Sequence, residues 1–202
     1  MNRAWRACLH LSFVIIPAGL PATSNPDTPS ITVRTYNLAN APLKDLEQAS
    51  RVAGEIFKRA GIEVRWLSCA LSVDQARSNR ACEEAIGGHD LDVIVSTSSI
   101  TRDGMATDTS LGFASPLAAS SQVVVLWDRS KKMAESSGVP AGIILGHAMA
   151  HELGHLLLQS MEHSRTGLMR SRWGKEELLR AESGRLLFTT EQATAMTGEL
   201  MK

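Results

Sequence analysis

The sequence predicts a single α/β domain, because strand-like and helix-like segments alternate along the 202-residue chain. Short segments with period-two alternation, or apolar throughout, are typical of strands, and longer segments with apolar residues three or four apart are typical of helices. Strand, helix, strand, strand, edge strand, strand, helix is an order that favours a twisted mixed sheet of about five strands covered by helices. The composition, 44% hydrophobic and 21% charged, is that of a globular domain.

The first half of the domain is predicted to hold two strands and a packing helix. Residues 31–38 alternate apolar and polar side chains, and residues 62–67 do the same. Between them, residues 42–60 place their apolar side chains on one helical face, and Gly61 ends the helix. Residues 68–89 are polar and are interpreted as a loop with room for a short helix.

The second half supplies the other strands. Residues 91–95 and 123–127 are apolar on both faces, which suits strands in the interior of a sheet covered on both sides. Residues 101–110 form a polar loop, followed by residues 111–114. We expect these four residues to form an edge strand, where the proline that follows at position 116 is tolerated.

Helices are predicted after the last strand. Residues 130–138 form a short capped helix, and residues 140–158 form a helix with apolar residues all round its axis, which must therefore be buried. Residues 173–180 are a charged segment without an assigned structure. Thr190 is expected to cap a last helix that begins at Glu191.

The N-terminus has the pattern of a secretory signal. Two arginines precede the apolar residues 7–20, and a polar, proline-rich stretch follows at residues 21–29. We therefore predict a signal peptide at 1–24, a linker at 25–30 and one catalytic domain at 31–202, in a secreted or periplasmic protein. A core helix that starts at the first residue is the alternative, but a histidine and a proline interrupt it.

Charge and cysteine content narrow the choice of partners. The 21 basic and 21 acidic residues balance, and no basic stripe indicates nucleic acid or an anionic membrane. No apolar run reaches the roughly 18 residues that span a bilayer. Once Cys8 leaves with the signal, Cys69 and Cys82 remain, and an even pair in an exported chain favours a disulfide over two buried thiols. We assume a monomer.

The residues that carry chemistry lie on the buried helix. His151-Glu152-Leu153-Gly154-His155 is an HExxH motif, in which two histidines four apart lie on the same helical face and can reach one cation. Glu152 is offset by about 100° from His151, so it suits a general base acting on water better than a ligand. Polar groups in so apolar a helix need partners, and a zinc ion supplies one for each.

A catalytic zinc site needs a third protein ligand and one open position. His163 follows His155 by eight residues, beyond the point where the apolar helix gives way to polar residues. Glu176 and Glu177 are the alternatives, because one group of zinc peptidases takes its third ligand from a downstream glutamate. We favour His163, since three-histidine catalytic sites are well precedented. His147, one turn before the motif, is interpreted as a core histidine.

This pattern resembles the active site of the metzincins, a clan of zinc peptidases. The resemblance lies in the HExxH helix, in the third histidine after a turn, and in Gly167-Leu168-Met169 as a methionine turn. It is nearest to small, predicted, secreted bacterial members with a lengthened spacing before the third histidine. It implies a metzincin-like fold, a structural role for Met169 beneath the metal, and an edge strand at residues 111–114 that holds the substrate.

The link to the third histidine departs from the usual metzincin pattern. Leu158 and Met161 stand where the pattern has a glycine and a histidine, and His163 comes two residues later. The link contains no glycine to adopt a left-handed conformation at low cost. We therefore expect Gln159 or Ser160 to end the helix.

Together these features predict a secreted metallopeptidase that hydrolyses a peptide or protein substrate with one zinc ion, with Glu152 as the base that activates water. Two alternatives stay open: a zinc hydrolase that acts on a non-protein amide or a cell-wall peptide, and a catalytically silent secreted zinc-binding protein. The glutamate argues against the silent protein, because a structural site usually closes its fourth position with another ligand.

Overall fold

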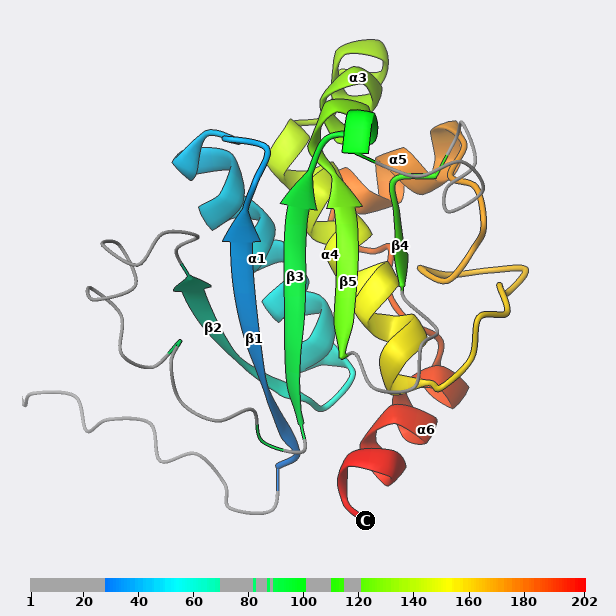
Figure 1. The fold of residues 1–202 in the computed structure, drawn as a ribbon. Coiled ribbons are helices and arrows are strands. Elements are labelled where there is room, and N and C mark those ends of the chain that lie inside the picture. Colours follow the sequence, from blue (N-terminus) through cyan, green and yellow to red (C-terminus); the bar gives the residue numbers. More distant parts are fainter. Residues whose placement is uncertain (1–27, 70–81, 83–86, 88, 101–109, 115–120) are drawn as a thin grey trace, which may run out of the picture.

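The computed structural model describes residues 28–69, 82, 87, 89–100, 110–114 and 121–202. The predicted signal peptide at residues 1–24, and half of the predicted linker, lie outside this part of the chain. So do most residues of the two polar loops predicted at 68–89 and 101–110. The remaining elements form one sheet with helices packed against it (Figure 1).

Five strands form the sheet in the order β2-β1-β3-β5-β4. Their bounds are β1 Ser30–Asn37, β2 Glu63–Cys69, β3 Asp90–Ser96, β4 Gly112–Ala114 and β5 Gln122–Leu126. The first three and β5 run parallel, whereas β4 runs antiparallel to β5 at the sheet edge, with Phe113 opposite Val124. The α/β class, the five-stranded mixed sheet and its antiparallel edge strand are confirmed.

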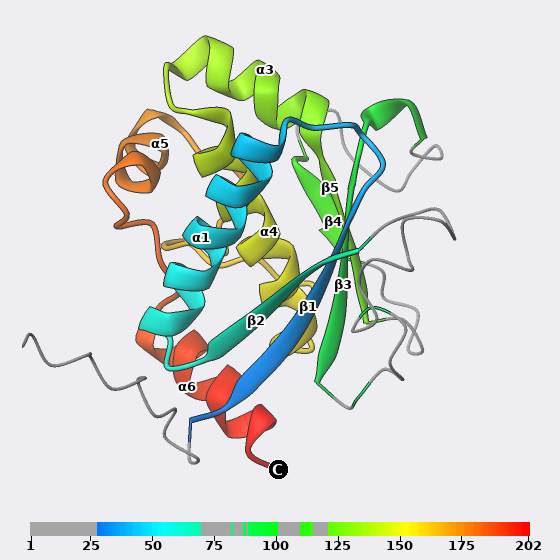
Figure 2. The ribbon, with the colours of Figure 1, turned by 90° about the vertical axis from the view of Figure 1, so that its left-hand side faces the viewer.

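Two long helices, α1 (Leu43–Arg59) and α4 (Ala141–Leu157), lie on the same side of the sheet (Figure 2). Fully buried side chains fill the space between these layers, among them Val93 and Val125 of the sheet, Phe57 of α1 and Met149 of α4. Nearly every residue of α4 is buried, as its lack of a polar face predicts.

Three further helices complete the described fold: α3 (Trp127–Ser137), α5 (Lys175–Glu182) and α6 (Thr190–Leu200), with a short 3₁₀ turn, η2, at Ser98–Ile100. The charged segment left unassigned by the sequence is mostly α5. None of the helices in the described part of the chain combines the length and apolarity needed to cross a membrane.

Two predicted helix starts were wrong, that of α3 by three residues and that of α6 by one. Helix α3 begins at Trp127, directly after β5, and not at Ser130. No turn separates strand from helix there, and the Asp128 carboxylate in the first turn accepts the N–H of Ser98 at 2.9 Å. Helix α6 is capped by Thr189, not Thr190: the Thr189 hydroxyl accepts the N–H of Gln192, whose side chain accepts the Thr189 N–H in return.

Cys69, the last residue of β2, forms a disulfide with Cys82. The predicted pairing is confirmed, and the alternative of two buried thiols is excluded. The crosslink ties the end of β2 to a segment thirteen residues further along the chain.

Glycines let α1 and α4 approach each other closely. A Cβ on Gly146 would lie 2.6 Å from the carbonyl oxygen of Ala49 and 2.8 Å from Cβ of Val52, both on α1. A Cβ on Gly142 would meet the backbone of Asp45 at 2.8 Å. Contacts this short leave no room for a methyl group, so glycine at these positions sets how deeply α4 sits in the core.

We expect Gly146→Ala to destabilise the protein by about 1–2 kcal/mol. Overpacking costs about 1–3 kcal/mol, and the higher helix propensity of alanine offsets up to about 1 kcal/mol of this. Gly198→Ala in α6 is the matched control, since nothing lies within 4 Å of the added carbon. That variant should be as stable as the wild type or more so. Urea unfolding measures both, and equal stability of the two variants would contradict the close approach.

Candidate metal centre

The first two residues of the candidate site lie on α4. His151 and His155 are one helical turn apart on the same face. Their exposed fractions are only 7% and 3%. The two ring centroids are 4.8 Å apart, and the two Nε2 atoms are 3.1 Å apart.

Backbone carbonyls fix the tautomer of both imidazoles. Nδ1 of His151 lies 2.9 Å from the carbonyl oxygen of Leu168, and Nδ1 of His155 lies 2.8 Å from that of Ser160. A carbonyl oxygen only accepts, so each Nδ1 carries the proton and donates it. Each Nε2 therefore presents a lone pair toward the other ring. Two such lone pairs repel each other unless a cation lies between them.

His163 completes a group of three imidazoles. Its ring centroid lies 5.3 Å from that of His151 and 4.9 Å from that of His155. One ligand atom from each ring lies within 4.8 Å of the other two. Within the described residues, no other three histidine, cysteine or carboxylate side chains gather in this way. The fold thus brings together the three histidines that the sequence predicts as ligands.

The two alternative carboxylates are engaged elsewhere. Glu176 pairs with Arg180 on the surface of α5. Glu177 pairs with Arg170, and it also accepts the N–H of Gly174 at 2.8 Å, which caps α5. That N–H and the Arg170 guanidinium lower the pKa of Glu177. Neither glutamate belongs to the group of three histidines.

Glu152 lies between α4 and the edge strand. Its side chain is 6% exposed, and a Cβ on Gly112 of β4 would lie 2.8 Å from its Cγ. The N–H of Ala114, also on β4, donates to the carboxyl group. Burial raises the pKa of Glu152 to about 8, although the Ala114 hydrogen bond opposes this shift. The absence of a side chain at position 112 lets the carboxyl group reach the strand.

Burial also sets the charge of the imidazoles. It lowers the pKa of His151 to about 4, although the Leu168 carbonyl opposes the shift. The pKa of His155 is lowered by the same cause. Both rings are therefore neutral near pH 7, and a neutral imidazole is the form that binds a metal ion.

The segment Gly167-Leu168-Met169, where the sequence predicts a methionine turn, packs against α4. Gly167 has a φ of 75°, a conformation that glycine adopts at little cost. The N–H of Leu168 donates to the carbonyl of Leu187 at 2.8 Å, which anchors the turn. Met169 is 1% exposed, and its sulfur lies 2.9 Å from the position that a Cβ on Gly154 would take. The turn therefore touches the helix at the residue before His155.

Sequence reasoning missed Trp173. Its indole N–H donates to the Leu168 carbonyl at 3.2 Å, the same oxygen that receives the Nδ1 proton of His151. Its ring also stands edge-on to His151, at 6.0 Å between centroids, and to His147, at 6.2 Å. The one feature of the sequence that could have drawn attention to Trp173 is that it is a large aromatic residue within a charged segment. That feature does not indicate which residues Trp173 contacts. His147 is buried, as predicted. Its Nδ1 lies 2.8 Å from the carbonyl oxygen of Ile143, one turn earlier in the same helix.

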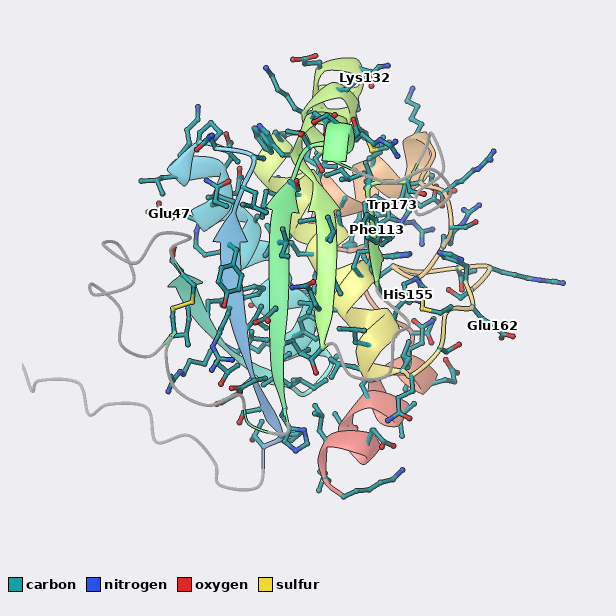
Figure 3. All side chains as sticks on the ribbon, viewed as in Figure 1. Glu47, Phe113, Lys132, His155, Glu162 and Trp173 are labelled. Atoms are coloured by element: carbon teal, nitrogen blue, oxygen red, sulfur yellow. A yellow bond between two sulfur atoms is a disulfide. The ribbon has the colours of Figure 1, made fainter. Side chains whose placement is uncertain are left out.

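A cavity of about 230 Å³ lies beside the imidazoles. The three histidines and Glu152 line it together with Leu111 and Phe113 at the edge of the sheet and with Arg172 and Trp173 in the segment after Met169. In Figure 3, Phe113, His155 and Trp173 lie close together to the right of β5, on the side of β4. A ligand in this cavity would touch the edge strand and the histidines at once.

No protein-family model matches the sequence, and a search of curated proteins finds no match. Among solved structures, the crystal structure of archaemetzincin from Methanopyrus kandleri is similar, with a TM-score of 0.53. The match covers 88% of this chain and 99% of archaemetzincin at 14% sequence identity. The comparison supports the predicted metzincin-like fold.

We expect the purified protein to bind a single zinc ion, and His163→Ala to weaken zinc affinity more than about 100-fold. Losing a ligand should cost more than the 10–100-fold typical of residues that only orient ligands. Competition with a chelator measures the affinity, and Glu176→Ala serves as the control that keeps wild-type affinity. Loss of zinc in the Glu176→Ala variant, with full binding in His163→Ala, would overturn this ligand set.

Proposed function

We propose that this chain is a zinc-dependent metallopeptidase. The observation that carries the proposal is the meeting of three imidazoles beside a buried glutamate, in a cavity bounded by the edge strand. The metzincin-like fold supports it, because the metzincins that the sequence resembles are zinc peptidases. The proposed catalytic domain comprises residues 31–202.

The donor set fits zinc. Imidazole nitrogens are common zinc ligands, and catalytic sites combine three protein ligands with one open position. His151, His155 and His163 would hold the ion through the nitrogens that face one another. Zinc at this position supplies a Lewis acid that lowers the pKa of a water molecule and polarises a carbonyl group.

Glu152 is proposed to move the proton. A general base works best when its pKa lies near the working pH. Burial raises the pKa of the Glu152 carboxyl group from its ordinary value toward that range. Its oxygens take a proton from the attacking water and deliver it to the leaving amine. The N–H of Ala114 holds the carboxyl group against β4 while it does so.

The substrate is proposed to be a peptide that lies extended along β4. This strand pairs with β5 on one side and is the last strand of the sheet in the described chain. An extended peptide adds to such an edge through main-chain hydrogen bonds. Phe113 lines the cavity from this strand and Leu111 from the residue before it, so a peptide there passes beside Glu152.

We further propose that the protein is exported and acts as a monomer, without a nucleic-acid partner. The Cys69–Cys82 disulfide suits an oxidising compartment such as the periplasm or the cell exterior. Mass spectrometry of the protein recovered from the producing cell should find a chain that lacks residues 1–24. A full-length chain in the cytoplasm would contradict the export proposal.

Glu152→Gln should leave zinc bound and reduce peptide hydrolysis by about 10²–10⁴-fold, the usual contribution of a general acid–base group. Glu162→Gln is the matched control, because Glu162 is an exposed carboxylate next to His163. It should keep wild-type activity. Zinc content and kcat for a peptide library are measured on both variants, and retained hydrolysis in Glu152→Gln would refute the assigned role.

A substrate screen separates the proposal from its alternatives. Folded proteins, short peptides, peptidoglycan fragments and simple amides are each incubated with the zinc-loaded protein. Cleavage of proteins or peptides supports the peptidase. Cleavage of peptidoglycan fragments or simple amides alone would replace it with another amidohydrolase, and zinc binding with no cleavage would replace it with a binding protein.

A further inference from the structure

The end of α4 is unusual because a glutamine takes the place of glycine. Gln159 has a φ of 49°, in the left-handed region that non-glycine residues enter at a cost of about 1–2 kcal/mol. The N–H of Gln159 donates to the carbonyl of Leu156, and the N–H of Ser160 donates to that of His155. These two bonds are the pair that defines a Schellman motif, which ordinarily has glycine at this position.

This reversal aims a carbonyl group at the metal site. After the left-handed residue the chain folds back over the last turn of α4, and the carbonyl of Ser160 lies 2.8 Å from Nδ1 of His155. His151 receives its carbonyl from a different segment, Leu168. The orientation of the His155 ring therefore depends on the conformation at Gln159. The same turn starts the exposed link that reaches His163.

The side chain of Gln159 is bound to the C-terminal helix. Its amide donates to a carboxylate oxygen of Glu199 at 3.0 Å, forty residues further along the chain. The other oxygen of Glu199 pairs with Lys202. Helix α6 is itself anchored in the core by Met196, which is fully buried. The left-handed turn is thus attached to a fixed element and not only to its own helix.

We infer that Gln159, held by Glu199, is a positioning residue for the metal centre, through which helix α6 sets the orientation of the His155 imidazole. The inference rests on the proposed zinc site. Carbonyl partners of ligand histidines commonly set zinc affinity, because they fix the tautomer and the ring orientation. Here the partner carbonyl is placed by a strained residue, so the contact that stabilises that residue contributes to metal binding.

Three single variants and one double variant of the full-length protein test this contact. Glu199→Ala removes the acceptor, and Gln159→Val resists the left-handed conformation because its side chain is branched at Cβ. Gln159→Glu places two carboxylates against each other. Combining Gln159→Glu with Glu199→Gln restores an amide–carboxylate pair with the roles exchanged. Glu182→Ala, an exposed carboxylate at the end of α5, is the control.

Zinc affinity by chelator competition is the main readout. Glu199→Ala and Gln159→Glu should weaken binding about three- to tenfold, less than the 10–100-fold of residues that bond a ligand directly, and Gln159→Val should weaken it about tenfold or more. The exchanged pair should recover most of the loss of Gln159→Glu, and Glu182→Ala should match the wild type. The visible absorption of the cobalt-substituted protein should change in the weakened variants and return in the exchanged pair.

Thermal unfolding of the metal-free proteins separates positioning from folding. The inference is supported if the affinity losses exceed any change in metal-free stability. It is overturned if all variants bind zinc as the wild type does, if affinity falls only in proportion to stability, or if the exchanged pair recovers nothing. Failure of the wild type to bind zinc would instead refute the proposed function, and this inference with it.

Discussion

Two buried imidazole nitrogens that face each other at 3.1 Å are the constraint on which the C-terminal half of this protein depends. Their lone pairs can face one another only because both Nδ1 protons are taken up by carbonyl groups. Unlike His147, which bonds a carbonyl of its own helix at Ile143, these two histidines bond carbonyls that lie outside α4. The chain returns to the helix twice, once at Ser160 and once at Leu168, and each return follows a residue with positive φ, Gln159 and Gly167.

The N-terminal half of the protein fixes the position of α4 by packing against it, as such a site requires. Glycines on its α1 side let the helices approach within contact of backbone atoms, and the apolar strands close the other side. Glu152 then points toward β4, where Gly112 leaves space for the carboxyl group and Ala114 donates to it. A buried carboxyl group with one hydrogen bond is protonated more easily than one in water, so the same packing that fixes its position also moves its pKa toward the working range of a general base.

Much of this arrangement is predictable from sequence, because it is periodic or local. Alternating and apolar segments predicted all five strands, and spacing along one helix predicted that His151 and His155 meet. That His163 joins them was predicted only through resemblance and ligand preference, since the link has no glycine to mark its turn. The contacts of Trp173 and the Gln159–Glu199 hydrogen bond could not be predicted from the sequence. Each depends on a hydrogen bond between segments with no common periodicity, and the second joins residues forty apart.

The left-handed glutamine shows why such contacts matter energetically. Glycine at position 159 would remove a strain of about 1–2 kcal/mol, but it would leave the turn without a side chain to bind α6. The exposed hydrogen bond to Glu199 offsets part of this strain. Stability alone then gives little reason to prefer glutamine. What the glutamine adds is a defined direction for the Ser160 carbonyl, and a ligand that binds only the correctly oriented rings stabilises that state by a free energy that grows with the logarithm of its affinity.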